Sequence, residues 1–347
     1  MRSLCLSLAY VLFSTPIAFS DARINTIFIV NSYTGDFVWT KNINENFIKK
    51  LSAAGWTENT HYKLVKRDLD AFKNHNLNSL EKISSKILNE IRKTKPDIIV
   101  TTDDDALINV GLKINDTPVV FNGIHAIADY LPGGKHSGRI NSLGKPGQNI
   151  TGVYQVDHIN ETFKLLKMIK PSVQKVAILV DTTTSGKATL AGFQKEIKNL
   201  SIQVSDILVS DSFKVWKRKI KEWQNKTDAI LYMQGNGVRD EGGRLMKVQE
   251  IIRYIADHSK LPDMATWEQP VEYGILLSAG VSPDYQGFYT AEKVLSILKD
   301  KAKPGEILIN VPLSGQPMVN IARAKKLNLF IPQELMNILV ENGKIYR

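Results

Sequence analysis

Short apolar runs alternate along the chain with longer segments in which apolar residues recur every three or four positions. Each apolar run has the length of a buried strand, and each longer segment has the pattern of an amphipathic helix. Strands that alternate with helices are typical of a parallel α/β sheet with right-handed crossovers. We therefore expect a first doubly wound lobe made of strand Ile24–Val30, helix Asn42–Ala54, strand Tyr62–Arg67, helix Leu80–Lys93, strand Asp97–Thr101, helix Ala106–Ile114 and strand Pro118–Asn122.

A loop rich in glycine and proline, Leu131–Gln148, interrupts this alternation, and a second alternating set follows it. The chain has 347 residues and 43% hydrophobic content, enough for two domains of similar size. Two such lobes suggest a hinged cleft receptor, although many two-domain enzymes share the pattern. The expected strands are Ile150–Val156, Lys175–Val180, Ile202–Val209, Ala229–Met233, Ile275–Ala279 and Ile307–Val311, and the expected helices are Glu161–Ile169, Lys187–Asn199, Phe213–Asn225, Leu245–His258, Gln286–Leu298, Ile321–Lys326 and Pro332–Glu341.

The N-terminal segment has the layout of a secretory signal peptide. Arg2 provides a short positive region, Leu4–Phe13 is mostly apolar, and small residues surround Ser20–Ala22. The apolar run is shorter than the roughly 18–20 residues of a membrane-spanning helix, so we favour a cleaved signal peptide over an N-terminal membrane anchor. We expect residues 1–22 to be removed near Ser20–Ala22 during export to the periplasm.

The only cysteine, Cys5, lies within this expected signal peptide. The exported chain then forms no internal disulfide and no cysteine-ligated metal centre. Cys5 also precedes the end of the apolar run, which is the wrong place for a lipid-modified cysteine after a signal sequence. We therefore expect a periplasmic protein that is not lipidated.

The formal charge of +10 suggests an anionic partner, but the distribution of the charge does not support nucleic acid. The lysines are spread along helix-like segments such as Phe213–Asn225 (FKVWKRKIKEWQN). They are not interleaved with aromatic residues in the way that marks single-strand binding. We interpret them as solvated helix faces and expect no nucleic-acid partner.

The motifs of common enzyme classes are missing from the sequence. It has no GxSxG, no HExxH, no P-loop and no GxGxxG after a strand, and its six histidines lack ligand spacing. The three adjacent aspartates, Asp103–Asp105, have no second acidic or histidine cluster to complete a metal site. We expect a protein that is not an enzyme and that carries neither a cofactor nor a metal.

Four separated blocks carry a resemblance to a known family. The chain resembles the ABC-transporter substrate-binding proteins with the type I periplasmic-binding-protein fold, whose best-known members bind aromatic amino acids. The blocks span nearly the whole mature chain in family order. They are NSYTGDFVW (Asn31–Trp39); PDIIVTTDDDA (Pro96–Ala106) with TPVVFNGI (Thr117–Ile124); PGQNITGVYQVDHINETFKLLKMIKPSVQKVAILVD (Pro146–Asp181); and the tail, from DYQGFYTAEKVLSILKDKAKPGEI (Asp284–Ile307) to NIARAKKLNLFIPQELM (Asn320–Met336).

The resemblance implies two doubly wound parallel-sheet lobes joined by a three-segment hinge, with crossings near Gly152–Val156, Leu277–Pro283 and Asn310–Ser314. The first lobe then comprises residues 23–152 plus 280–309, and the second comprises residues 153–279 plus 310–347. The implied function is capture of a small molecule by lobe closure, as a monomer, for the membrane permease subunits of an ABC importer. A periplasmic subunit that presents its ligand to a membrane sensor kinase or cyclase is the alternative.

Ligands of open α/β sheets bind where the carboxyl ends of the strands meet. There, hydroxyls and free N–H groups hold carboxylates, aromatic rings stack, and aspartates favour an amine. We also expect one of Asp103–Asp105 to cap the next helix. Relatives often have an aspartate shortly after the glycine of the fourth strand, whereas this chain has GIHAIADY at that place. For Trp39, packing beneath its loop is the alternative to contact with a ligand. We expect an amino acid or another amine-bearing solute to contact Ser32, Tyr33, Trp39, Thr102, Asp103, Asp104, Asn122, His125, Tyr154, Thr182, Thr183, Gln234, Asn236, Trp267 and Glu268.

Overall fold

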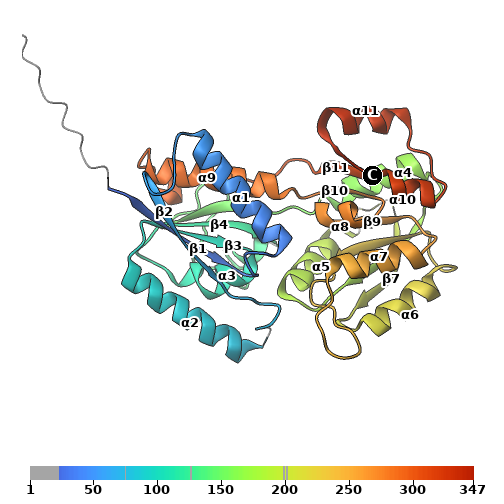
Figure 1. Cartoon of the computed structure of the whole chain (residues 1–347), viewed down its shortest axis with the longest axis horizontal. Helices are drawn as coiled ribbons and strands as arrows, with labels where there is room; N and C mark the ends of the chain where they lie inside the picture. The colour runs from blue at the N-terminus through green and yellow to red at the C-terminus, as the bar shows by residue number, and fades with distance from the viewer. Residues whose placement is uncertain (1–22, 75, 126, 198–199, 201) are drawn as a thin grey trace, which may run out of the picture.

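The computed structural model describes residues 23–74, 76–125, 127–197, 200 and 202–347, which form two α/β lobes side by side (Figure 1). The expected signal peptide lies outside the described residues. Within the described ranges, no helix is both long and apolar enough to cross a membrane. The expected fold class, two α/β lobes built on parallel sheets, is confirmed.

The first lobe is built on a parallel five-stranded sheet with the order β2-β1-β3-β4-β5. Successive side chains of a strand point to opposite faces, so both faces of this buried sheet are apolar. Phe28 and Val30 face α2 and α3, and Ile27 and Ile29 face α1 and α9 (Figure 1). The elements are β1 (Asn25–Asn31), α1 (Val38–Ala53), β2 (Tyr62–Asp68), α2 (Leu77–Thr94), β3 (Ile98–Thr102), α3 (Asp104–Asn109), β4 (Val119–Ile124), β5 (Ile150–Tyr154) and α9 (Pro283–Leu298).

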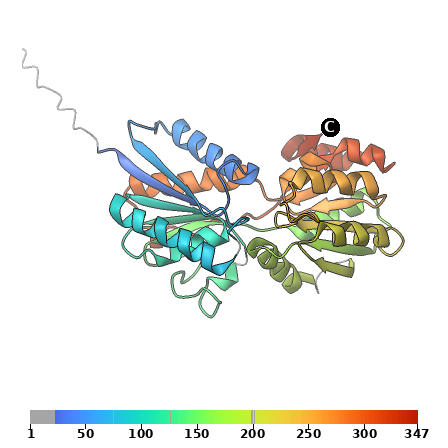
Figure 2. The same cartoon turned by 60° about the horizontal axis from the view of Figure 1, so that its bottom comes forward.

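The second lobe has a seven-stranded sheet with the order β12-β11-β10-β9-β8-β6-β7, in which β11 runs antiparallel to β10. Figure 2 shows helices on both faces of this sheet. The elements are α4 (Ile159–Ile169), β6 (Lys175–Val180), α5 (Thr184–Glu196), β7 (Gln203–Val209), α6 (Phe213–Trp223), β8 (Ala229–Gln234), α7 (Val248–His258), β9 (Asp263–Ala265), α8 (Glu268–Tyr273), β10 (Leu277–Gly280), β11 (Gln316–Asn320), α10 (Ile321–Lys326), α11 (Gln333–Asn342) and β12 (Lys344–Tyr346).

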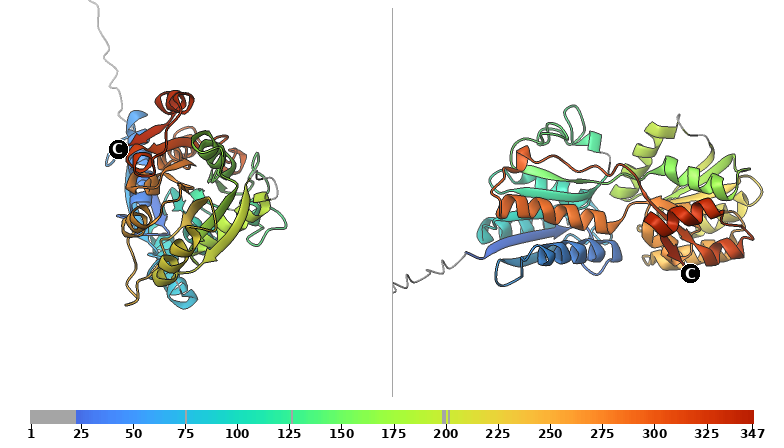
Figure 3. Two further views of the ribbon diagram at one scale, coloured as in Figure 1. Left: turned by 90° about the vertical axis from the view of Figure 1, so that its right-hand side faces the viewer. Right: turned by 90° about the horizontal axis from the view of Figure 1, so that it is seen from above.

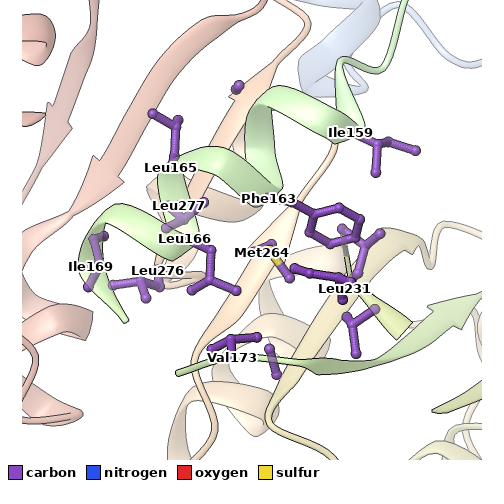
Figure 4. Close-up of a cluster of buried hydrophobic side chains, with 14 of the residues drawn as sticks. Ile159, Phe163, Leu165, Leu166, Ile169, Val173, Leu231, Met264, Leu276 and Leu277 are labelled. Carbon is purple, nitrogen blue, oxygen red and sulfur yellow. The ribbon is translucent and has the colours of Figure 1, made fainter. Parts of the chain in front are cut away.

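The core of the second lobe also divides between the two faces of its sheet. On one face of the sheet, Phe163 and Leu166 of α4 pack over the strands, close to Leu231 and Met264 (Figure 4). On the other face α6 and α7 bury their apolar stripes, including the fully buried Trp216. Each lobe therefore has its own hydrophobic core, and the lobes can move relative to one another without breaking either core.

The chain passes between the two sheets three times, at residues 155–158, 281–282 and 311–315 (Figure 3). The first crossing follows β5, which pairs with β4 as far as Tyr154, two residues beyond the expected lobe limit. The first and third crossings start side by side, because Tyr154 N–H donates to the Asn310 carbonyl. These three segments join the lobes and form the hinge.

The strand expected at Ile307–Val311 is wrong. In this segment only Asn310 forms a β-bridge, with Val153. The Ile307 carbonyl accepts a hydrogen bond from the side-chain hydroxyl of Thr151 and not from the backbone of a neighbouring strand. Pro312 lacks an N–H and cannot extend the pairing. The short elements β9, α8, β11 and β12 were not expected from the sequence.

Candidate functional site

Side chains from both lobes and from the first crossing meet at the carboxyl ends of the strands. They surround a space with a free volume of about 20 Å³, below the roughly 300 Å³ at which small-molecule sites begin. The two lobes are therefore closed on one another in this structure. The residues around this cleft are Tyr33, Phe37, Trp39, Asp103, His125, Gln155, Ser185, Gln234, Asn236 and Trp267.

Asp103 is held between β3 and α3 with one carboxylate oxygen free. Its backbone has a φ of 67°, a left-handed conformation that is uncommon for a residue with a side chain. The Oδ1 atom accepts a hydrogen bond of 3.0 Å from Trp39 Nε1, and Oδ2 has no partner among the described residues. Asp103 is 2% exposed. A buried carboxylate oxygen without a partner is costly, and a donor supplied by a ligand removes that cost.

An aspartate occupies the expected cap position of the next helix, but the capping hydrogen bond comes from another residue. Asp103 occupies the cap position of α3, but its side chain makes no capping hydrogen bond. The Ser32 hydroxyl accepts from Ala106 N–H at 2.8 Å and donates to the Thr102 carbonyl. Because Ser32 takes over the capping from the neighbouring strand, the Asp103 carboxylate remains available to the cleft.

Asp104 belongs to a buried network beneath the cleft. Its carboxylate lies 2.9 Å from His125 Nδ1 and accepts a hydrogen bond of 2.6 Å from the Tyr130 hydroxyl. Burial favours the neutral form of His125, but the hydrogen bond and charge of Asp104 outweigh it and raise the pKa of His125 to about 9. The imidazole is therefore protonated at neutral pH, and Asp104 is its counter-ion.

Gln155 links this network to the cleft. In the structure Gln155 Nε2 lies 2.9 Å from His125 Nε2, and Gln155 Oε1 has no partner in the described part of the chain. Both ring nitrogens of a protonated histidine donate. Two donors cannot bond to one another, so we assign the amide the other way round, with its oxygen toward His125 and its NH₂ group on the free side.

The cleft thus contains two free acceptors and two free donors. The acceptors are Asp103 Oδ2 and Asn236 Oδ1, and the Asn236 amide nitrogen is already bonded to Gln234. The donors are Trp267 Nε1, which has no partner among the described residues, and the NH₂ group of Gln155 in the assigned orientation. Acceptors that include a carboxylate suit an ammonium group, and neutral donors suit a carboxylate.

Aromatic rings form the rest of the cleft wall. Trp39 and Trp267 come from different lobes and meet edge to face, with ring centroids 6.0 Å apart. Tyr33 stacks on Phe72 at 4.0 Å and meets Phe37 edge to face. An aromatic ligand finds both ring faces and ring edges here.

Hydrogen bonds hold the two lobes together at the cleft. The Tyr33 hydroxyl lies 2.6 Å from the Ser185 hydroxyl, and the Thr184 hydroxyl donates to Asp105 at 3.0 Å. Arg239 donates to the Phe72 carbonyl at 3.1 Å. All three bonds break when the lobes separate.

We expect Tyr33→Phe to shift the chain toward open arrangements, because it removes the hydroxyl that reaches Ser185. Small-angle X-ray scattering of the ligand-free chain should give a larger radius of gyration than the wild type. The matched control is Tyr346→Phe, because the Tyr346 hydroxyl bonds to Glu268 within the second lobe. An unchanged radius in Tyr33→Phe would contradict a role for this bond in closure.

The structure places the other residues expected to contact the ligand outside the cleft wall. Thr182 and Thr183 line a separate polar cavity of about 310 Å³ at the cleft edge, where they bond to Asp211 and Asp181. Glu268 accepts from Lys344 and Tyr346 and does not reach the cleft. Residues buried beneath or beside the cleft are Ser32, Thr102, Asp104, Asn122 and the half-buried Tyr154.

Sequence reasoning missed Phe37, Gln155 and Ser185. Gln155 follows β5 on the first crossing, next to Tyr154, and Ser185 follows Thr184 in the first turn of α5. Gln155 is next to Tyr154, and Ser185 is two residues after Thr183; both of these neighbours are expected from the sequence to contact the ligand. In the described ranges, no three His, Cys, Asp or Glu side chains come close enough to hold a metal ion.

Comparison with known proteins identifies the family. The model of the ABC transporter substrate binding protein family matches residues 50–343. The chain belongs to this family. It is therefore a substrate-binding protein and not an enzyme, and the resemblance carried by the four sequence blocks is confirmed.

The chain is also similar to individual proteins. The chain is 22% identical over 286 residues to the "Tyrosine-binding protein" of Clostridioides difficile strain R20291, covering 82% of this chain and 76% of that protein. Its fold resembles an ABC domain from Streptococcus pneumonia solved in complex with L-Trp, with a TM-score of 0.72 and 18% identity over 93% of this chain and all of the other. It also resembles a ligand-free, open substrate binding protein from Clostridium difficile, with a TM-score of 0.69 and 16% identity over 93% of this chain and 99% of that one.

Proposed function

We propose that the exported chain captures an amino acid or another amine-bearing solute between its lobes and delivers it to the permease subunits of an ABC importer. The observation that carries this proposal is the buried Asp103 Oδ2, which has no partner in the described chain, in a cleft that is also lined by Asn236 with its free Oδ1. The free carboxylate oxygen and the free amide oxygen together accept two of the three hydrogen bonds that an ammonium group donates.

The ligand bridges the lobes in this scheme. Asp103 belongs to the first lobe, Asn236 to the second, and Gln155 to the crossing between them. An ammonium held by Asp103 and Asn236 therefore stabilises the closed arrangement, while Gln155 and Trp267 donate to the carboxylate of an amino acid. Because the free volume in this structure is only about 20 Å³, the solute enters while the lobes are apart, and the lobes then close around it less far than they do here.

The side chain of the solute lies against Trp39, Trp267 and Tyr33 in this proposal. Relatives with the names "Tyrosine-binding protein" and "in complex with L-Trp" support an aromatic amino acid as the first candidate. Membership in a transporter family favours import over the sensing alternative. Export to the periplasm without a lipid anchor and action as a monomer complete the proposal.

Matched ligands test this proposal. L-tryptophan and L-tyrosine should raise the melting temperature of the chain, whereas indole-3-propionate and 3-(4-hydroxyphenyl)propionate, which lack the amine, should have little effect. Tryptamine and tyramine, which lack the carboxylate, should bind more weakly than the amino acids and more tightly than the acids. Other amino acids and amines extend the series, and sugars and nucleosides serve as negative controls. Stabilisation by the amine-free compounds equal to that by the amino acids would contradict the proposal.

A further inference from the structure

A second cavity lies at the hinge, and it shares no residue with the cleft. It has a free volume of about 730 Å³, within the roughly 300–1,000 Å³ range of small-molecule sites. Its walls include Val156, Val281 and Pro312, which belong to the first, second and third crossings. We call this cavity the hinge groove. A molecule bound in it contacts both lobes, because α9 of the first lobe faces α4 and α11 of the second across it (Figure 3).

Aromatic and apolar side chains form most of the wall of the hinge groove, and the charged residues Glu161, Lys164 and Asp284 also line it. Tyr285 and Phe288 on α9 each pack against Tyr289, with ring centroids 4.4 Å and 5.2 Å apart. Leu165 on α4 and Ile338 on α11 line the opposite wall. A planar apolar molecule fits between aromatic rings and aliphatic side chains.

Two residues of the groove wall each carry a buried acceptor atom that has no partner in the described structure. The first is Nε2 of His158, a residue whose side chain is 6% exposed and whose Nδ1 faces Glu161 at 3.5 Å. Burial lowers the pKa of His158, so the ring is neutral, and with its proton on Nδ1 toward Glu161 the Nε2 atom accepts. The second acceptor is Gln316 Oε1. Because buried acceptors without a partner are unfavourable, a ligand that carries a hydrogen-bond donor suits this groove.

We propose that the hinge groove is a second binding site, for a small aromatic molecule that carries an N–H or O–H donor. His158 lines the groove, and its backbone adopts a left-handed φ of 43°, which is strained for a residue with a side chain. The site is separate from the cleft and does not rest on the function proposed for the cleft.

Fluorine NMR with 5-fluoroindole tests this site, since the probe combines an aromatic ring with one N–H donor. Two tryptophan variants of the third crossing are compared. Ser314 lines the groove, so Ser314→Trp fills it, whereas Leu313 is 96% exposed and is not part of its wall, so Leu313→Trp is the matched control. We expect Leu313→Trp to bind like the wild type and Ser314→Trp to bind at least about tenfold more weakly. Binding elsewhere is the same in both variants, so their difference reports the groove.

Two further measurements test the recognition of the donor. Methylation of the probe nitrogen, in 1-methyl-5-fluoroindole, should weaken binding about three- to tenfold. Gln316→Met should weaken binding of 5-fluoroindole by a similar factor. Because this substitution exchanges side chains of similar length, it also tests the site if Ser314→Trp fails to fold. Equal affinity of the two tryptophan variants, or no line broadening with the wild type at the solubility limit of the probe, would overturn the site. Equal affinity for the methylated probe would overturn the role of the donor.

Discussion

Asp103→Asn is expected to weaken the binding of an amine-bearing ligand by about 30-fold or more. The substitution keeps the shape of the side chain and removes the charge that pairs with the ammonium. The free Oδ2 atom is buried in the closed cleft, so bulk water does not screen the lost interaction. Isothermal titration calorimetry with the most strongly stabilising compound of the ligand series measures the effect.

The control for this substitution is Glu268→Gln, the same chemical change at a carboxylate outside the cleft. Glu268 pairs with Lys344 and Tyr346, so its replacement should leave the affinity unchanged. Wild-type affinity in Asp103→Asn would show that the amine lies elsewhere.

The affinity should also depend on pH through Asp103. Burial raises the pKa of this carboxyl to about 8, so it is mostly protonated at pH 6 and loses that proton when an ammonium binds. Affinity of the wild type should therefore rise by up to about tenfold per unit between pH 6 and 8. The Asp103→Asn variant has no proton to lose at this position, and its affinity should stay flat over the same interval. A flat wild-type profile would contradict ion pairing at Asp103.

Asp104→Asn is expected to destabilise the fold, with a loss of about 3–5 kcal/mol in the free energy of unfolding at pH 6. The substitution leaves the protonated His125 without its counter-ion in a buried site and removes an acceptor of the Tyr130 hydroxyl. Urea denaturation monitored by circular dichroism measures the loss. Asp257→Asn is the control, since Asp257 pairs with Lys326 at the surface and its replacement should cost under about 1 kcal/mol.

The pH dependence of this loss separates the ion pair from simple packing. The pKa of His125 is raised in the folded state, from 6.5 to about 9. The pair therefore contributes its full stability below pH 6.5 and loses it as the pH rises through 9. The difference between wild type and Asp104→Asn should be largest at pH 6 and should shrink above pH 9. An equal difference at both pH values would contradict a charged pair.

The sequence predicts the long buried elements well, because parallel strands covered on both faces appear as continuous apolar runs. The strand Lys175–Val180 and the helix Ile321–Lys326 have the same limits in the sequence pattern and in the structure. The three-residue strands β9 and β12 are too short to produce a period. They form because the sheet extends across β10 and β11, a non-local effect.

The cleft was predictable only as a set of strand ends. The aspartates after β3 were good candidates, but the sequence could not divide their roles. Asp103 keeps an oxygen free only because Ser32, 74 residues from Ala106 in sequence, caps the helix in its place. The sequence also could not show that Glu268 pairs with Lys344, which is 76 residues away, because no local pattern reveals this contact.

A crystal structure of the chain with its most strongly stabilising amine-bearing compound tests the central claim most directly. We expect the ammonium nitrogen to lie about 2.7–3.0 Å from Asp103 Oδ2 and to contact Asn236 Oδ1, with both lobes closed on the ligand. A ligand bound outside this cleft, or an ammonium group without contact to Asp103, would contradict the account.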